Sequence, residues 1–269
     1  MRRSLHLTTL GLTLLLSAAA ARGGEPTARE LLDQVRDLNH TTRHWKDRTQ
    51  KLTLTIVDRR GGERVRDLEI FTKRYEQDAD RTLLFFLGPA EVRGIGLLQW
   101  TQPSAADQQW LYLPELKRVR QITGSSKRDS FAGTDFSFQD LAIISEIADW
   151  TDAKAKATRL REETLDGHQC AVIEFEPTDP DITYGKIRMW LGLDDLIAHQ
   201  YEFDDRQGEL AKRLLVSDIR PIEGIPTAYR LEMRNERTGS RSVAAFGEVQ
   251  YNTNLADDLF SERRLERGV

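Results

Sequence analysis

The sequence predicts a mainly β fold, in which an antiparallel sheet with one apolar face and one charged face is accompanied by a few helices. Apolar residues alternate with polar ones over many short runs, which is the period of a strand lying between two different surroundings. Turn signals such as Asp166-Gly167 and Gln207-Gly208 separate the runs at hairpin spacing. Charged residues make up 30% of the chain and hydrophobic residues 39%. This composition favours a single sheet curled over a small helical layer rather than a thick two-sheet sandwich.

The N-terminus has the pattern of a cleavable signal peptide. Arg2 and Arg3 precede an apolar run, residues 10–16, and small residues then lead to Ala19-Ala20-Ala21. The apolar run is too short to span a bilayer as a helix. An N-terminal core helix is the alternative interpretation. We therefore expect residues 1–21 to direct export by the general secretory route, with cleavage near Ala21 and a mature protein in the periplasm.

The remaining residues, 22–269, are expected to form one domain, because no linker, low-complexity tract or internal repeat interrupts them. Loss of Arg2 and Arg3 changes the formal charge from −4 to −6. An acidic balance without a basic stripe argues against a nucleic-acid partner. Cys170 is the only cysteine, so no intramolecular disulfide can form, and its strand-like surroundings predict a buried structural thiol.

Two helices are expected. Thr27 and Glu30 have the spacing of a capping box, and apolar residues recur at helical intervals after them, which predicts a helix over residues 28–39. Ser137 can cap a second helix that begins near Phe138, with Asp140 as the reciprocal carboxylate. This second, amphipathic helix is either a lid on the concave face of the sheet or an ordinary packed connector.

About ten strands are expected between and after these helices. Residues at alternate positions of several runs would point into one apolar hollow. These candidate ligand-cavity residues are Leu52, Leu54, Ile56, Ile187, Met189, Tyr201, Phe203, Tyr229, Leu231 and Met233.

The loop before the second helix is the most distinctive segment. It reads Gly133-Thr134-Asp135-Phe136-Ser137-Phe138-Gln139-Asp140-Leu141. Gly133 allows a sharp turn, and Phe136 and Phe138 bring two large rings to the start of the helix. We interpret this segment as a gate in which one ring packs over the hollow; the alternative is that both rings belong to a fixed core.

Catalytic and metal-binding patterns are absent from the sequence. It contains no His-Glu-x-x-His, Gly-x-Ser-x-Gly, Walker or Gly-x-Gly-x-x-Gly motif. His40 and His44 have the spacing of helical metal ligands but no accompanying cysteine or carboxylate cluster, and His168 is expected to be exposed in a hairpin turn. We expect no enzyme activity, no cofactor and no metal.

Several segments together resemble a known family. They are Gly88-Pro89, Arg93-Gly94-Ile95-Gly96-Leu97-Leu98, Trp110-Leu111-Tyr112-Leu113-Pro114, the segment 133–141, Tyr184-Gly185-Lys186-Ile187 and Leu259-Phe260-Ser261. With the exported start and the opening helix, they are similar to the outer membrane lipoprotein-sorting protein family, the LolA-like, treponemal-type group. The resemblance covers nearly all of the mature chain, and segment 133–141 is its most specific part.

The resemblance implies a LolA-like incomplete antiparallel β-barrel, a single curved sheet with an α-helical lid. It also implies a periplasmic carrier or chaperone that binds a lipoprotein acyl chain or a lipid in the half-barrel, in some members beside an inner-membrane exporter of the resistance-nodulation-division type. The alternative is an accessory interaction module of a membrane exporter that binds no lipid. The partners implied are a lipid or acylated lipoprotein, and the protein is not expected to be integral to the membrane.

The export interpretation predicts a mature chain that begins near Arg22 and is recovered from the periplasmic fraction. Cleavage after Ala19-Ala20-Ala21 is the physical reason, because signal peptidase requires small residues there. N-terminal sequencing of the fractionated protein measures it. A membrane-bound chain that retains Met1 would contradict the interpretation.

Overall fold

The computed structural model describes residues 24–75, 79–101 and 107–268, so the expected signal peptide, residues 1–21, lies outside the described residues. Within the described residues, thirteen strands form one sheet. They are β1 (Asp47–Val57), β2 (Glu63–Arg74), β3 (Asp80–Gly88), β4 (Gly96–Thr101), β5 (Gln108–Leu113), β6 (Arg118–Ile122), β7 (Ala155–Leu165), β8 (His168–Pro177), β9 (Lys186–Gly192), β10 (Ala198–Asp204), β11 (Leu210–Ile222), β12 (Ile225–Asn235) and β13 (Ser240–Tyr251).

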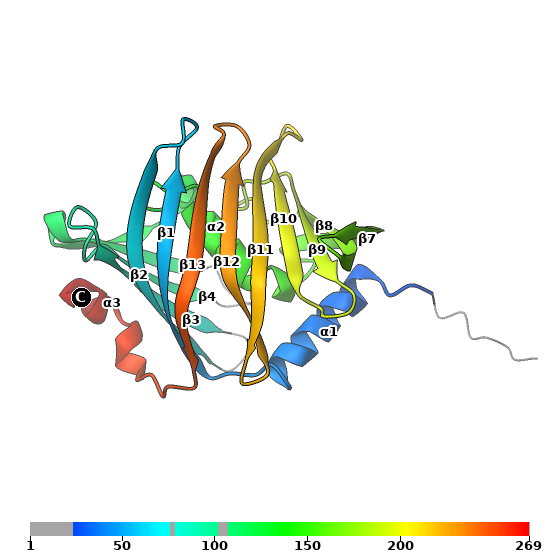
Figure 1. The fold of residues 1–269 in the computed structure, drawn as a ribbon, viewed down its shortest axis with the longest axis horizontal. Coiled ribbons are helices and arrows are strands. Elements are labelled where there is room, and N and C mark those ends of the chain that lie inside the picture. Colours follow the sequence, from blue (N-terminus) through cyan, green and yellow to red (C-terminus); the bar gives the residue numbers. More distant parts are fainter. Residues whose placement is uncertain (1–23, 76–78, 102–106, 269) are drawn as a thin grey trace, which may run out of the picture.

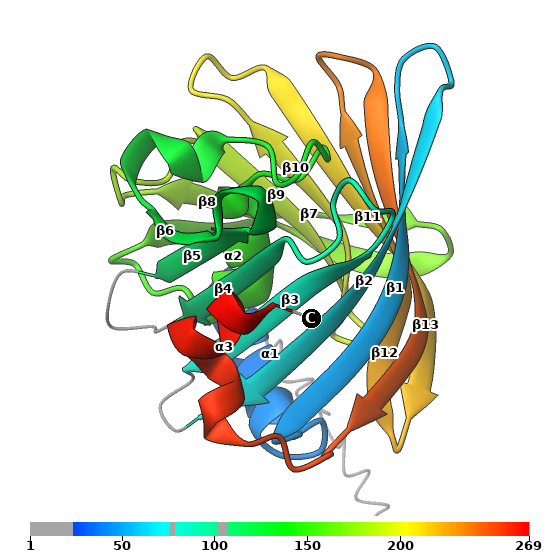
Figure 2. The same cartoon turned by 90° about the vertical axis from the view of Figure 1, so that its left-hand side faces the viewer.

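The sheet is antiparallel and open, as expected of an incomplete barrel. Its strand order is β6-β5-β4-β3-β2-β1-β13-β12-β11-β10-β9-β8-β7, so β6 and β7 are its two edges. The first six strands run as a meander from β1 to one edge, and the last seven return from the other edge until β13 pairs with β1. The sheet curves into a half-barrel, with the helices α1 and α2 on its concave side (Figures 1 and 2).

The connection between the two edges passes over the concave face. β6 ends at Ile122 and β7 begins at Ala155, at opposite edges of the sheet, so residues 123–154 must span its width. This connection contains α2 (Phe138–Glu146), which buries Phe138, Ala142 and Ile143 against the sheet. The predicted helix start is confirmed: the Ser137 side chain accepts from the Asp140 backbone N–H, and the Asp140 carboxylate accepts from that of Ser137.

The opening helix, α1 (Ala28–His40), also begins where the sequence predicts, with a complete Thr27–Glu30 capping box. Its apolar stripe of Leu31, Leu32 and Val35 is buried in the same concave-face core. A third helix, α3 (Glu262–Arg267), follows the short 3-10 helix η5 (Asp257–Phe260) near the C-terminus. Among the described residues, no helix has both the length and the apolar character needed to cross a membrane.

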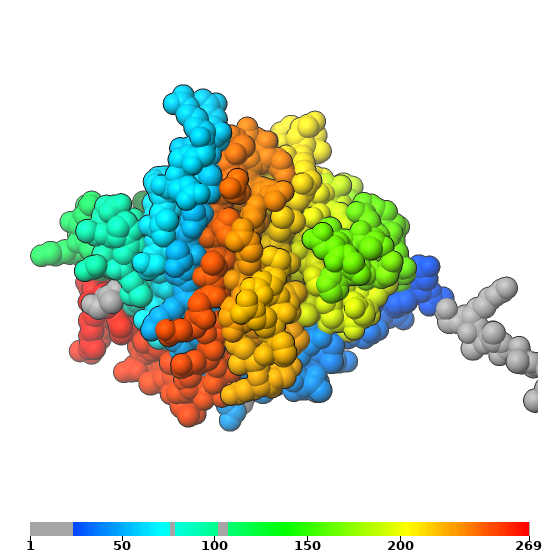
Figure 3. Space-filling model, in the orientation of Figure 1, coloured from blue at the N-terminus to red at the C-terminus, as the bar shows by residue number. Residues whose placement is uncertain are grey.

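The convex face is not uniformly charged, which corrects the expectation of one apolar and one charged face. Leu83 and Phe85 on β3 point outward and pack with Phe260 and Leu265 of the C-terminal segment. Because their neighbours Leu84 and Phe86 are buried on the concave side, β3 has two apolar faces and shows no alternation in its sequence. Figure 3 shows the remainder of this face, where no helix lies across β1, β13 or β12.

Candidate functional site

A cavity of about 590 Å³ lies on the concave side of the sheet, between the strands and the helices α1 and α2. That volume falls within the roughly 300–1,000 Å³ of typical small-molecule sites. Half of the ten sequence-predicted cavity residues line it: Leu52, Leu54, Met189, Tyr201 and Leu231. They come from β1, β9, β10 and β12, so the cavity brings together strands from both meanders of the sheet.

The other five predicted residues do not line the cavity. Four of them are almost fully buried in the packed core, because each lies one inward-facing position from the cavity residue of its strand, on the side of the segment that leads into α2. These four residues are Ile56, Ile187, Phe203 and Met233. Tyr229 is a correction of another kind. Its ring lies under the guanidinium group of Arg220, 4.6 Å from the ring centroid, and takes no part in the cavity wall.

The wall formed by β1–β4 changes from apolar to charged along the strands. Cross-strand register places inward residues of the four strands at successive levels. The deepest level is Leu52 and Leu68; the next is Gln50, Ile70, Leu84 and Leu97; the third is Arg48, Thr72, Thr82 and Gln99; the last is Arg74, Asp80 and Thr101. We call the end with the last two levels, where β1 and β12 begin, the mouth.

Aromatic and basic side chains gather at the mouth. Two guanidinium groups lie over the Trp45 ring, that of Arg74 at 3.9 Å and that of Arg48 at 4.8 Å from its centroid. Burial lowers the pKa of Arg74, and the charge of Arg48 lowers it further, while Asp80 and Asp149 oppose this shift. Arg43, which follows α1, donates to the carbonyl oxygens of Asp195 and Leu196 in the β9–β10 hairpin.

The opposite end of the hollow is closed by residues 130–141, which we call the plug. Asp140 is fully buried at its centre, where its carboxylate accepts from Lys212 Nζ at 2.6 Å and from the Tyr184 hydroxyl at 2.5 Å. Burial and the charge of Asp140 raise the pKa of Tyr184 well above its ordinary value. Tyr184 therefore stays a neutral donor, and the carboxylate is held from the plug, from β11 and from the segment before β9.

Further polar contacts fix the plug to the sheet. The Asp135 carboxylate accepts from Ser240 at 2.5 Å and from Ser242 at 2.7 Å, both on β13. Thr134 bonds within its own turn, to the carbonyl oxygens of Phe131 and Phe136. Gly133 has φ +73°, a conformation that favours glycine. These contacts give each polar residue of the distinctive motif a structural partner, which the sequence alone could not name.

The two rings of the motif lie in different surroundings. Phe136 is 6% exposed and lines the cavity. Phe138 is 3% exposed and does not line it, but packs edge-on against Phe131, which does. Leu141 also lines the cavity. The expectation that one of the two rings packs against the hollow fits Phe136, while the surroundings of Phe138 are those of a core residue. The gating role remains a prediction.

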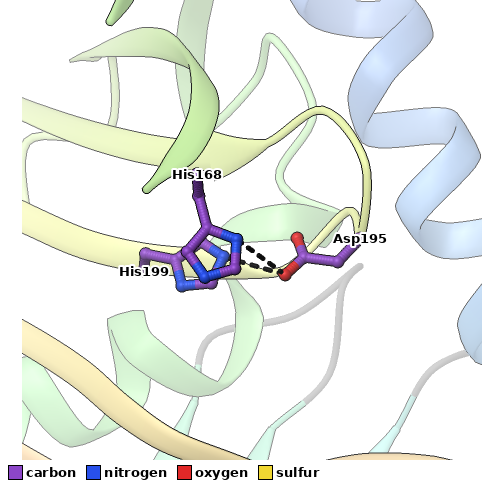
Figure 4. A group of neighbouring side chains, drawn as sticks. All are labelled: His168, Asp195 and His199. Carbon is purple, nitrogen blue, oxygen red and sulfur yellow. Dashed lines mark hydrogen bonds and ion pairs between the residues drawn. The ribbon is translucent and has the colours of Figure 1, made fainter. Parts of the chain in front are cut away.

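One group of potential metal ligands escaped the sequence analysis. His168, Asp195 and His199 offer ligand atoms that all lie within 4.8 Å of one another (Figure 4). His199 Nε2 lies 2.9 Å from Asp195 Oδ2, and His168 Nδ1 lies 3.7 Å from it. The imidazole rings stack at 4.0 Å, so His168 is half-buried rather than an exposed turn residue.

Cys170 lies beside this group and is a buried thiol, as expected. Burial, together with the negative charges of Asp195 and Asp194, raises the pKa of Cys170 to about 11. A thiol that stays protonated at neutral pH is a poor nucleophile and a poor metal ligand.

The mouth arginines are the main feature that sequence reasoning missed. Alternation in the run from Arg48 to Leu54 does carry the signal, because Arg48 and Gln50 have the same parity as Leu52 and Leu54. In the next strand, Thr72 and Arg74 likewise continue the alternate positions of Leu68 and Ile70. Charged residues were assigned to the outer face, so the polar half of each inward row was overlooked.

Comparison with known proteins gives matches over most of the chain. A family model whose description reads "uncharacterized protein" matches residues 78–267. No curated protein matches the sequence. A crystal structure described as an outer membrane lipoprotein-sorting protein domain, from Vibrio parahaemolyticus, superposes with a TM-score of 0.81 at 26% identity, covering 89% of this chain and 98% of that one.

Two further crystal structures have similar folds. A DUF1329 family protein from Desulfovibrio piger has a TM-score of 0.80 at 25% identity, covering 88% of this chain and 97% of that one. A LolA superfamily protein from Nitrosomonas europaea has a TM-score of 0.66 at 18% identity, covering 89% of this chain and 100% of that one. The last likeness concerns the fold alone.

The different surroundings of the two plug rings predict different effects of their removal. Phe138→Ala should cost about 3–5 kcal/mol of stability, as for a fixed core ring. Phe136→Ala should cost less, because its ring borders existing space, and should speed the exchange of a bound probe. Thermal unfolding and the dissociation rate of a fluorescent fatty acid measure both effects. Equal, large destabilisation of both variants with unchanged dissociation would contradict a gating role.

Proposed function

Because this chain belongs to the LolA-like outer membrane lipoprotein-sorting family, we propose that it is a carrier or chaperone for an apolar ligand. The ligand is a lipid or the acyl chain of a lipoprotein, held in the hollow of the half-barrel. The observation that carries the proposal is the cavity of about 590 Å³, whose inner walls are built of Leu52, Leu54, Met189 and Leu231.

The energetics of such a site suit a carrier. Burial of an alkyl chain gains about 0.8 kcal/mol per methylene, so fifteen methylenes give a gross gain of roughly 12 kcal/mol. Ordering the chain and displacing the groups around the cavity offset much of this gain. The remainder is a reversible affinity, which a carrier requires because cargo held too tightly would not be released to an acceptor.

The proposal also covers the cellular compartment and the mature form of the protein. The mature chain, residues 22–269, acts as one domain in the periplasm after removal of residues 1–21. The Vibrio parahaemolyticus protein is described as a lipoprotein-sorting protein domain, and we accordingly propose a binding function without catalysis. The plug, with its buried Asp140–Lys212 pair, then closes one end of the hollow, where Phe136 borders the ligand, and the mouth is the other end.

The proposal also concerns the proteins that deliver the ligand to the carrier and receive it. The family resemblance favours an inner-membrane exporter of the resistance-nodulation-division type as a partner. The second candidate function, an exporter-associated module that binds no lipid, uses the same fold. An apolar hollow that binds amphiphiles favours the carrier, whereas a hollow that binds none favours the interaction module.

Substitution of a cavity residue tests the proposal. Leu231→Arg places a charge in the apolar part of the wall, and burial of an unpaired charge costs several kcal/mol, so binding of a fluorescent fatty acid should fall at least tenfold. Leu231 is only partly buried, so the variant should still fold. Fluorescence titration measures the affinity, and circular dichroism checks the fold.

The matched control is Ala245→Arg, which adds the same charge to the exposed side of the neighbouring strand β13 and should leave binding unchanged. Glu232, next to Leu231, is unsuitable as an exposed control because it is 9% exposed and paired with Arg230 and Arg234. Equal loss of binding in both variants would contradict the assignment of the cavity face.

A further inference from the structure

The cavity has a chemically graded wall, and the gradient constrains its ligand. Leucine side chains at the deep levels give way to Gln50, Thr72, Thr82 and Gln99 and then to Arg48 and Arg74. Thr72 and Thr82 are hydrogen-bonded to each other, and Gln99 is bonded to Gln109 and Ser145. A purely apolar chain would therefore be tolerated at this level but would leave the guanidinium groups beyond it in contact with hydrocarbon, which costs free energy for each group without a partner. A ligand that is apolar at one end and polar at the other matches the wall along its length.

The mouth favours a negatively charged group, because its two arginines Arg48 and Arg74 have few partners in the part of the chain that the structure describes. The Nε atom of Arg48 is buried and lacks a hydrogen-bond partner among the described residues. Arg74 donates to the Asn39 carbonyl oxygen at 3.5 Å, and its nearest carboxylate contact, with Asp80, is 4.0 Å long. Both contacts are at the limit of their range, so the guanidinium group retains most of its capacity to bind an anion.

The location of the two arginines also favours an anionic ligand. Arg48 and Arg74 both contact the Trp45 ring, and the charge of Arg48 lowers the pKa of Arg74, so two interacting positive charges lie at the end of an apolar hollow. Asp80 and Asp149 also line the mouth and offset part of this charge, while Arg43 adds a third guanidinium group that is bonded to carbonyl oxygens. Guanidinium groups are the side chains that most often bind carboxylate or phosphate oxygens in proteins.

Resting on the proposed carrier function, we infer that the ligand is an anionic amphiphile, whose chain occupies the apolar part of the cavity and whose carboxylate or phosphate headgroup is bound at the mouth by Arg48 and Arg74. The headgroup accepts a hydrogen bond from the unpartnered Arg48 Nε–H. Thr72, Thr82 and Gln99 lie between the headgroup site and the apolar part of the cavity. Free fatty acids and phosphorylated lipids share this chemistry.

Three ligands with one chain length test the inference on the delipidated mature protein. Dodecanoate, dodecyl phosphate and dodecanol compete for bound N-phenyl-1-naphthylamine, a neutral fluorescent probe of apolar sites. We expect one or both anions to bind at least about tenfold more tightly than dodecanol, the effect of one charge-assisted hydrogen bond. The tighter anion identifies a carboxylate or a phosphate source.

Variants locate the effect. Arg48→Gln and Arg74→Gln should each lose most of the preference for the anion while retaining the affinity for dodecanol, which also shows that the cavity is folded. Lys51→Gln is the matched control: it removes a positive charge from β1 on the outward face, where Lys51 pairs with Glu248 at 3.1 Å, and should leave the preference intact. If Arg74→Gln unfolds, Arg48→Gln decides the matter.

The possible failures are distinct. If none of the three ligands displaces the probe, the carrier function fails and this inference falls with it. If all three bind with equal affinity, the carrier function stands and the anionic headgroup is overturned. If the preference for the anion persists in Arg48→Gln, the assignment of the headgroup site to the mouth is overturned.

Discussion

The width of the open sheet is the constraint on which the rest of this structure depends. The two meanders end at opposite edges, so the connection between β6 and β7 has to cross the concave face. Polar groups of this connection are therefore buried against the sheet and need hydrogen-bond partners. The buried carboxylate of Asp140 supplies several: it caps α2, pairs with Lys212 and accepts a hydrogen bond from Tyr184. Loss of either charge would leave the other buried without a partner, which is strongly destabilising. The crossing closes one end of the hollow and leaves the cavity at the other.

Closure of one end gives the hollow a direction. Along β1, the inward residue at the plug is the core residue Ile56, the next ones, Leu54 and Leu52, line the cavity, and the one at the mouth is Arg48. One strand thus serves three purposes at successive inward positions. From the plug to the mouth, the wall is first apolar and then charged, which matches the order of the chain and headgroup in an amphiphile. The two ends of the hollow therefore differ, since one is closed by the plug and the other is lined by charged side chains.

Local signals made part of this structure predictable. Both capping boxes, Thr27–Glu30 and Ser137–Asp140, are contained in four residues and were confirmed. Strands with one solvated face could be recognised by alternation, and the half-barrel followed from the family resemblance. β3 could not be recognised, because the C-terminal Phe260 covers its outer face and removes the alternation. The His168–His199 stack and the Asp135–Ser242 contact join residues far apart in sequence, so only the folded chain brings them together.

The central claim is that this protein carries an amphiphile in its half-barrel. Native mass spectrometry of the protein isolated from the periplasm without detergent, followed by lipid extraction and identification, tests it most directly. The account predicts a complex with bound lipid that bears a carboxylate or phosphate headgroup and an alkyl chain, and its loss in the Leu231→Arg variant. Protein isolated in the same way at the mass of the bare mature chain, with no lipid in the extract, would contradict it.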